Sequence, residues 1–270
     1  MSEIIVVKLG GTEGVNFSSI CADAVSLQQQ GRQLVFVHGG SAEANALGEA
    51  LGAPPRIITS PSGYTSRYTD RKTLEIFLMA VNGKVNSLLT EQLQGLGLNA
   101  LGLSGLDGRL LQAERKEAIQ SIENGKRKII HDDYTGKISA VNSALLHLLL
   151  GAGYLPVIAP VAVSPKGEAL NVDADRAAAM VAGALQAETL VLLTAVPGLM
   201  AKFPEESSLI AHLSTVQLEG ALEAAQGRMK KKVLGAQEAL AAGVGQVIIA
   251  DGRIAAPISS ALSGKGTVIA

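Results

Sequence analysis

Short runs of β-branched residues and leucine alternate along this chain with longer stretches of helical periodicity, and this alternation limits the possible fold more than any other feature. Continuous apolar strands joined by helices are typical of a mainly parallel sheet that helices cover on both faces. The sequence therefore predicts an α/β sandwich. The predicted strands are Ile4–Leu9, Leu34–His38, Asn99–Leu103, Leu155–Pro160, Thr189–Thr194, Gln246–Ala250 and Gly266–Ile269. The predicted helices are Ser18–Gln30, Ala42–Leu51, Arg71–Gly95, Val141–Gly151, Ala174–Leu185 and Gly227–Ala242.

A length of 270 residues suits one large α/β domain or two closely packed lobes. We predict a lobe boundary in the turn Ser164–Gly167, which divides the chain into residues 1–166 and residues 167–270. Residues 104–140 differ from the rest of the chain, because their alternation and turn residues predict β-hairpins that project from the main sheet.

Composition argues against several classes of function. The 23 basic and 24 acidic side chains give a net charge of −1, which provides no global basic field to attract nucleic acid or an anionic membrane. Aromatic residues make up only 3%, so few rings are available to stack on bases. The single cysteine, Cys21, and four scattered histidines indicate no metal site made of side chains. With neither a signal peptide nor a membrane span in the pattern, the sequence predicts a soluble cytoplasmic protein.

Glycine pairs follow two of the predicted strands directly, in Lys8-Leu9-Gly10-Gly11 and in His38-Gly39-Gly40-Ser41. Open α/β sheets bind ligands at the carboxyl ends of their strands. Without Cβ atoms, the backbone N–H groups of such turns can approach an anion, and Lys8 adds a positive charge beside the first turn. The two turns could hold a phosphate and an oxyanion, or each could be a structural tight turn.

Polar residues also mark the starts of three helices. Asn171, Asp173 and Asp175 precede or open one helix, and N-capping accounts for only one of the three. Asp175 could orient lysines, and Asn171 could bond a substrate. Lys230–Lys232 lie at the start of a helix, where cations oppose the macrodipole, so they indicate either a phosphate clamp or a solvated charge run. Arg67 precedes the long helix and could grip a carboxylate with two hydrogen bonds.

Taken in order, these segments resemble the amino acid kinase family, which includes acetylglutamate kinase. The resemblance covers essentially the whole chain, and its landmarks are Val7–Gly11, Val37–Gly40, Arg67–Asp70, Asn171–Asp175, Leu193–Leu199 and Gly227–Val233. Further segments are more similar to the branch of the family that acts on a carrier-bound substrate on the route to lysine. These segments are Tyr68–Phe77, Leu103–Leu110, Asp132–Gly136, Ala225–Met229 and Ala250–Arg253.

The resemblance implies a three-layer αβα sandwich whose N-terminal lobe binds the acyl substrate and whose C-terminal lobe binds ATP with Mg²⁺. Lys8 and Lys232 would stabilise the transferred phosphoryl group, and Asp175 would hold the two lysines in place. The substrate-binding residues it implies are Gly39, Gly40, Arg67 and Asn171. The nucleotide-binding residues it implies are Gly10, Gly11, Thr194, Gly198, Leu199 and Lys202. Relatives commonly carry Asp or Asn where this chain has Ala195, which alters the side-chain contacts expected at the nucleotide loop.

In this branch the substrate is attached to a small acidic carrier protein, LysW, which requires a local basic rim for docking. The cations expected there are Arg115, Lys116, Lys126, Arg127, Lys128 and Lys137, unless they form a solvated hairpin surface. The resemblance also implies a homodimer formed through a helix and a strand of the N-terminal lobe.

The activity implied by the resemblance is phosphorylation of the side-chain carboxylate of carrier-bound 2-aminoadipate. Carrier-bound glutamate and free N-acetylglutamate, both on routes to arginine, remain alternatives. Aminoadipate and glutamate differ by one methylene, which a hydrophobic pocket distinguishes by only about 1–3 kcal/mol. A non-catalytic sensor of nucleotide or amino acid is the alternative outside enzymes.

Overall fold

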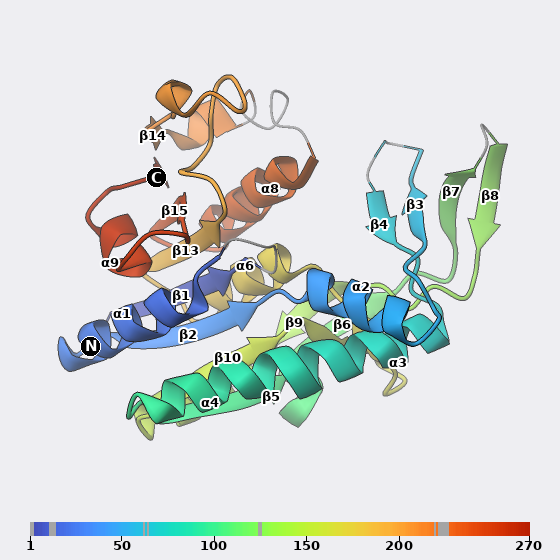
Figure 1. Cartoon of the computed structure of the whole chain (residues 1–270), viewed down its shortest axis with the longest axis horizontal. Coiled ribbons are helices and arrows are strands. Elements are labelled where there is room, and N and C mark those ends of the chain that lie inside the picture. The colour runs from blue at the N-terminus through green and yellow to red at the C-terminus, as the bar shows by residue number, and fades with distance from the viewer. Residues whose placement is uncertain are drawn as a thin grey trace.

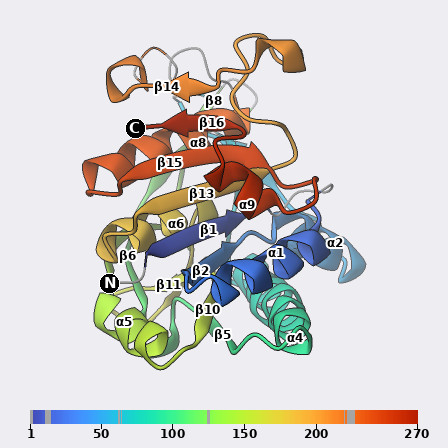
Figure 2. The same cartoon turned by 90° about the vertical axis from the view of Figure 1, so that its left-hand side faces the viewer.

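The computed structural model describes residues 3–10, 15–61, 63, 65–123, 126–218, 220 and 227–270, and its main element is an eight-stranded sheet (Figures 1 and 2). In spatial order its strands are β14 (His212–Leu213), β16 (Thr267–Ile269), β15 (Gln246–Asp251), β13 (Thr189–Thr194), β1 (Ile4–Leu9), β2 (Gln33–His38), β10 (Leu155–Ala159) and β5 (Ala100–Ser104). Only the β15–β16 pair in this order is antiparallel. The mainly parallel sheet predicted from the sequence is confirmed.

Helices cover both faces of this sheet, which confirms the three-layer αβα sandwich (Figure 2). On one face lie α5 (Ser143–Gly151), α6 (Ala174–Ala184) and α8 (Gly227–Ala241), and on the other lie α1 (Phe17–Gln29), α4 (Ser87–Gly95) and α9 (Pro257–Leu262). Successive residues of β1 point to opposite faces: Val6 packs into the first core, whereas Ile5 and Val7 pack into the second. The strands are mainly apolar because both of their faces are buried.

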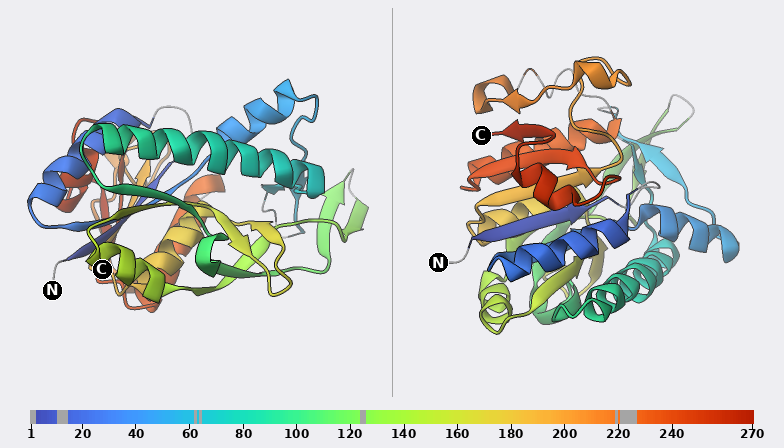
Figure 3. Two further views of the ribbon diagram at one scale, coloured as in Figure 1. Left: turned by 90° about the horizontal axis from the view of Figure 1, so that it is seen from below. Right: turned by 60° about the vertical axis from the view of Figure 1, so that its left-hand side comes forward.

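The long helix predicted over 71–95 is continuous in extent but not uniform in winding. It consists of α3 (Arg71–Leu78), the π-helix η1 (Met79–Asn86) and α4, and it runs along the sheet (Figure 3). The π segment was not predicted, because a hydrophobic period does not distinguish one extra residue per turn. Together with α2 (Ser41–Ala50), η1 packs on the carboxyl end of β2.

Three smaller sheets lie beyond the carboxyl ends of the central strands. A four-stranded sheet has the order β12 (Ala169–Asn171), β11 (Val161–Val163), β6 (Leu111–Arg115) and β9 (Gly136–Val141). Two hairpins, β3 (Ile57–Thr59) with β4 (Thr65–Arg67) and β7 (Ile119–Glu123) with β8 (Lys126–Ile130), project from the body of the molecule (Figure 1). Hairpins within residues 104–140 were predicted, and the antiparallel pairs β6–β9 and β7–β8 confirm them. The β3–β4 hairpin was not predicted.

Among the described residues, the remaining elements are three short 3₁₀ helices, η2 (Asp107–Arg109), η3 (Glu206–Ser208) and η4 (Thr215–Gln217). Strands from both predicted lobes belong to the one main sheet, where β1 pairs with β13. The boundary between 1–166 and 167–270 stays a prediction. Within the described part of the chain, none of the helices is both long and apolar enough to cross a bilayer.

Asp23 connects α1, near the start of the chain, to α9, near its end, and this contact leads to a prediction about stability. Its buried carboxylate on α1 accepts hydrogen bonds from the N–H groups of Ile258 and Ser259, at 2.6 and 2.8 Å, and so caps α9. Asp23→Ala leaves both donors without this acceptor, and we expect the free energy of unfolding to fall by about 3 kcal/mol. Urea denaturation measures the loss. The exposed Ser26→Ala on the same helix serves as a control and should change stability by less than about 0.5 kcal/mol.

Candidate active site

Three buried charged side chains meet where the carboxyl end of β1 approaches helices α6 and α8. Lys8 Nζ lies 2.9 Å from Asp175 Oδ1, and Lys232 Nζ lies 3.0 and 3.1 Å from the two carboxylate oxygens of Asp175. Lys8 is only 6% exposed, Asp175 8% and Lys232 7%. The structure thus brings together the three residues predicted to be catalytic, from three elements far apart in the sequence.

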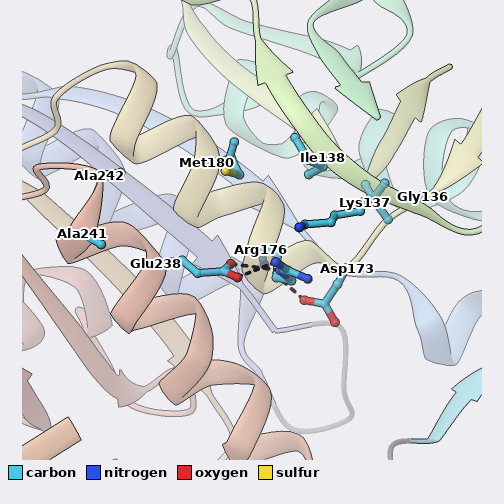
Figure 4. A pocket seen from close by; sticks show the side chains of 10 residues that line it. Gly136, Lys137, Ile138, Asp173, Arg176, Met180, Glu238, Ala241 and Ala242 are labelled. Atoms are coloured by element: carbon cyan, nitrogen blue, oxygen red, sulfur yellow. Dashed lines mark hydrogen bonds and ion pairs between the residues drawn. The ribbon is translucent and has the colours of Figure 1, made fainter. Parts of the chain in front are cut away.

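Local interactions explain why Asp175 points at the lysines. Asp173 is the N-cap of α6, because its Oδ1 accepts hydrogen bonds from the N–H groups of Asp175 and Arg176 at 3.0 and 3.1 Å. The predicted N-capping role is therefore confirmed for one of the three polar residues. Arg176 also forms a two-bond ion pair with Glu238, which joins α6 to α8 (Figure 4). This pair holds the two helices in the register that lets Asp175 contact Lys232.

Neighbouring lysines on α8 have different partners, which resolves the ambiguity of the sequence. Lys231 Nζ lies 3.6 Å from Asp173 Oδ2 and is partly exposed, whereas Lys232 is buried against Asp175. The run of cations is therefore not simply a solvated surface.

The cluster carries a formal charge of +1, with two ammonium groups and one carboxylate, so it favours a bound anion. The two lysines outweigh burial and hold the pKa of Asp175 well below its usual range, so that it stays ionised. Burial, with the positive charge of Lys8, lowers the pKa of Lys232 to about 8. The attraction of Asp175 opposes that shift without cancelling it.

These shifts predict an alkaline limb in the activity. As pH rises through about 8, Lys232 loses its proton in the free protein, and kcat/KM for phosphoryl transfer is expected to fall. The sign is opposite for stability: between about pH 8 and 10.4 the unfolded state holds the additional proton, so this group makes the free energy of unfolding rise with pH. A pH–rate profile measures the limb. In Lys232→Arg, whose guanidinium does not titrate, an unmoved limb would assign it to another group.

Both glycine turns lie at the carboxyl ends of the adjacent strands β1 and β2. Gly10 is buried, and Gly11 lies outside the described residues. The N–H of Gly39 donates to Leu9 O at 2.9 Å, so that this group links the two turns. Gly40 begins α2, in which the Ala44 N–H donates to its carbonyl.

The predicted substrate residues Arg67 and Asn171 are linked through one hydroxyl. Asn171 Nδ2 donates to Thr69 Oγ1 at 3.1 Å, and that hydroxyl donates to Arg67 O at 3.1 Å. The Arg67 guanidinium donates to Ser41 O at 3.0 Å, beside the Gly39–Gly40 turn, and burial lowers its pKa. The structure therefore places the four predicted substrate residues in one neighbourhood.

Asp133 supports this group and was not singled out in the sequence. It is 2% exposed, and its carboxylate accepts hydrogen bonds from the N–H groups of Thr69 and Thr135, at 3.0 and 2.9 Å. The only signal in the sequence is the polar turn 132–136. Nothing in that turn distinguishes the buried Asp133 from the exposed Asp132.

Four of the six predicted nucleotide residues lie at the end of β13 or in the segment that follows it. Thr194 ends β13, and its carbonyl accepts from the Gly252 N–H at 2.7 Å. A Cβ at Gly198 would lie 2.7 Å from Thr267 Oγ1, so only glycine fits there. The Leu199 N–H donates to the same hydroxyl at 2.8 Å, and its side chain is buried. Lys202 is exposed beyond this loop.

The six predicted docking cations differ in their exposure and contacts. Arg115 is held internally, because its guanidinium donates to Asp133 O, pairs with Glu168 at 3.0 Å and lies 3.7 Å from the centre of the Tyr134 ring. Its side chain is still 21% exposed, so its part in docking stays a prediction. Lys126, Arg127 and Lys128 are exposed on β8, and Lys116 is exposed just before β7. Lys137, on β9, lines a cavity of about 460 Å³ beside Arg176 and Glu238 (Figure 4).

A second cavity, of about 520 Å³, lies between the projecting hairpins and the N-terminal ends of α6 and α8. Its walls include Thr65 and Ser66 from β4, Lys116, and Asp173 with Lys231 beside the lysine–aspartate cluster. The cavity thus adjoins both the Arg67 group and the charged cluster, and it can admit an extended polar chain from the hairpin side.

Comparisons with known proteins agree with this geometry. Residues 3–251 match the profile of the amino acid kinase family. The chain is 55% identical to the [LysW]-aminoadipate kinase of Deinococcus radiodurans, over 98% of this chain and 91% of that protein. It is 54% identical to the [LysW]-aminoadipate kinase of Thermus thermophilus, over 98% and 100% of the two chains.

Among solved structures, N-acetylglutamate synthase from Neisseria gonorrhoeae, complexed with coenzyme A and N-acetyl-glutamate, superposes with a TM-score of 0.80 at 28% identity. The match covers 99% of this chain but spans only 59% of the synthase chain. A near-complete profile match, full-length relatives above 50% identity and the shared fold lead to one conclusion: this chain belongs to the amino acid kinase family.

Proposed function

We propose that this protein phosphorylates the side-chain carboxylate of 2-aminoadipate bound to the carrier protein LysW, with ATP as the phosphoryl donor, in cytoplasmic lysine biosynthesis. The structural observation that carries the proposal is the buried Lys8–Asp175–Lys232 cluster beside the two glycine turns. The names of the relatives at 55% and 54% identity support the acceptor. Lys8, Asp175 and Lys232 are all present, and both lysine Nζ atoms lie within 3.0 Å of Asp175 Oδ1, which favours a kinase over a sensor.

The site suits transfer to a carboxylate. A carboxylate is already ionised near pH 7, so the reaction requires no general base. ATP supplies the γ-phosphoryl group, whose bond to the β-γ bridging oxygen breaks as a bond to the acceptor oxygen forms, leaving ADP and an acyl phosphate. The chain's own task is to align two anions and to offset their repulsion. We assign that electrostatic task to Lys8 and Lys232, and their orientation to Asp175.

Magnesium is proposed to accompany the nucleotide. Within the described ranges, no group of three or more His, Cys, Asp or Glu side chains could hold a metal ion. The two buried ammonium groups instead fit a ligand whose own phosphate oxygens hold Mg²⁺. For the nucleotide we propose contacts with Gly10, Thr194, Gly198, Leu199 and Lys202; Gly11 and the C-terminal lobe as a whole belong to the same proposal.

On the acyl side, we propose that the substrate chain enters through the 520 Å³ cavity and that Gly39, Gly40, Arg67 and Asn171 bind its amino-acid end. Arg67 is suited to a carboxylate because its guanidinium already lies at the Gly39–Gly40 turn. The acidic carrier would then rest on the hairpin side, where Lys116, Lys126 and Arg127 are exposed.

Substrate choice tests the proposal directly. We would measure ADP release with ATP and Mg²⁺ on three acceptors: LysW-linked aminoadipate, LysW-linked glutamate and free N-acetylglutamate. The proposal expects turnover on LysW-linked aminoadipate. A preference for LysW-linked glutamate or free N-acetylglutamate would instead indicate an arginine-pathway kinase. Nucleotide binding without turnover on any acceptor would indicate a sensor.

The carrier surface has its own test. Lys126→Glu with Arg127→Glu is expected to raise KM for the carrier-bound substrate about tenfold or more while leaving kcat unchanged, because charge complementarity mainly sets the association rate. The effect should shrink at high salt. The exposed Lys166→Glu, in the turn between β11 and β12, is the matched control for a change of charge alone. Equal KM values for the double variant and this control would remove β8 from the docking surface.

We also propose a homodimer formed through the N-terminal lobe. Strand β5 is the last strand of the main sheet, and α4 beside it exposes Leu88 at 54%, with Leu96 at 44% just after its end. An edge strand and a neighbouring apolar helix face can both be covered by a second copy. Light scattering tests the assembly, and a monomer or a hexamer would contradict it.

A further inference from the structure

A buried chain of hydrogen bonds connects the π-helix to the Gly39–Gly40 turn. His38, the last residue of β2, is fully buried, and its Nδ1 lies 2.6 Å from Gly39 O. Its Nε2 lies 3.0 Å from Nδ2 of Asn86, the last residue of η1. The same Asn86 nitrogen lies 2.8 Å from Val157 O on β10.

The chemistry of these partners determines the direction of each hydrogen bond. Gly39 O and Val157 O can only accept, so His38 donates through Nδ1–H and Asn86 donates through its amide nitrogen. Asn86 Nδ2 has one further acceptor within reach, Leu103 O at 3.4 Å, but His38 Nε2 is nearer at 3.0 Å. We therefore assign the second hydrogen of that nitrogen mainly to His38 Nε2, which accepts it. The ring is therefore neutral and in a single tautomer. Burial lowers the pKa of His38 to about 4, and the charge of Lys8 contributes to the shift against the opposing bond to Gly39.

These hydrogen bonds also determine the orientation of the Gly39–Gly40 peptide group. The Gly39 residue is held on both sides, since its N–H donates to Leu9 O and its carbonyl accepts from His38. In a trans peptide the carbonyl of Gly39 and the N–H of Gly40 point in opposite directions. With the carbonyl turned toward the buried ring, the Gly40 N–H faces away from it.

The π-helix contributes a second contact to the same turn. A Cβ at Gly40 would lie 2.7 Å from Val81 Cγ1, so the backbone of the turn approaches η1 more closely than any other residue type allows. The extra residue per turn in η1 brings Val81 and Asn86 to the same strand end. Departures of this kind from α-helical winding are frequent at functional sites.

We propose that His38 and Asn86 are positioning residues: they orient the Gly40 N–H toward the oxygen atoms that gain or carry charge during phosphoryl transfer. Neither side chain touches the substrate, and both act through the Gly39–Gly40 peptide. This inference rests on the proposed acyl-kinase function. It means that the buried end of β2 contributes part of the stabilisation of the transition state.

A pair of variants separates positioning from packing. His38→Leu fills the apolar space but donates no hydrogen bond to Gly39, and we expect kcat to fall about 10²-fold with KM for ATP nearly unchanged. His38→Asn is smaller and polar but restores a donor near the Nδ1 position, and it should recover kcat to within about tenfold of wild type. A packing role predicts the reverse order, with Leu the more active variant, and that order would overturn the proposal.

Asn86 offers an independent check on the same chain. Asn86→Leu should give the same split between kcat and KM, and the double variant with His38→Leu should lose no more than the worse single variant, because the two act in series. Asn82→Ala, in the same π-helix, is the control and should keep kcat within about twofold. Independent, multiplying losses would overturn the proposed series. Melting temperatures and ATP titrations identify any variant that is merely unfolded.

A readout without any acceptor distinguishes this inference from the proposed function. The ¹⁵N chemical shifts of the His38 ring should show a protonated Nδ1 and an unprotonated Nε2 between pH 6 and 8. The opposite tautomer or a charged ring would overturn the inference even if the wild type is an active kinase. Failure of the wild type on every acceptor, with the expected tautomer present, would overturn the proposed function and the catalytic part of the inference together.

Discussion

Lys8→Met is expected to lower kcat by about 10²–10³-fold without unfolding the protein. The ammonium group of Lys8 is buried at the end of β1, where it provides one of the two positive charges of the cluster. A preorganised charge in a buried site contributes several kcal/mol to the stabilisation of a developing anion, because no solvent screens it. Methionine keeps most of the apolar stem, so the change removes mainly the charge.

Lys8→Met should also raise the pKa of Lys232, while leaving the free energy of unfolding nearly unchanged. Lys8 is one of the groups that lower the pKa of Lys232, so its removal should shift the pKa of Lys232 upward from about 8. The remaining Asp175–Lys232 pair is charge-balanced, and the free energy of unfolding should not fall appreciably. Lys166→Met, an exposed lysine outside the cluster, is the control. Steady-state rates for Lys8→Met within threefold of this control would contradict an electrostatic role for Lys8.

Asp175→Asn should reduce the free energy of unfolding by about 3–5 kcal/mol, as expected when one partner of a buried ion pair is removed. The substitution leaves two buried ammonium groups beside a neutral amide, with nothing to offset their repulsion. Urea denaturation at pH 7 measures the loss, and activity should fall as well, because the lysines lose the group that orients them.

Two further variants show whether the loss of stability in Asp175→Asn comes from the buried carboxylate itself. Asp173→Asn changes the same atoms two residues away, but asparagine caps a helix about as well as aspartate, so its cost should stay below about 1 kcal/mol. Adding Lys8→Met to Asp175→Asn removes one of the two positive charges that repel each other, and it should recover part of the stability. Equal losses for the Asp173 and Asp175 variants would show that the buried carboxylate does not carry the expected energy.

Much of the sheet could be predicted because its signal is local. The bounds of β1 and β13 match the predicted runs, since strands buried on both faces form nearly continuous apolar runs. The strands β3, β4, β11 and β12 have three residues each, too few to show a period, and none of them was predicted. The equally short β16 was predicted only as part of the run Gly266–Ile269. The π-helix escaped prediction for a related reason, because its winding depends on the neighbours that η1 packs against.

In the candidate site too, some residues could be predicted from the sequence and others became evident only from the structure. Residue types drew attention to Lys8, Asp175 and the run Lys230–Lys232, and the family resemblance implied Lys232 within that run. The supporting Asp133, His38 and Asn86 became evident only from their burial and partners. The contacts of Arg115 with Glu168 and the Tyr134 ring were likewise not evident from the sequence, because they join residues far apart in the chain.

By itself, the sequence determined the alternation of strands and helices, the glycine turns at the strand ends and the presence of a polar N-cap before α6, since each depends on neighbours within a few residues. Tertiary structure alone decided which of three consecutive lysines reaches Asp175, 57 residues away, and that His38 is a neutral hydrogen-bond donor to the turn. Burial and the choice of distant partners set these properties, because a charge or an imidazole takes its state from what surrounds it in space.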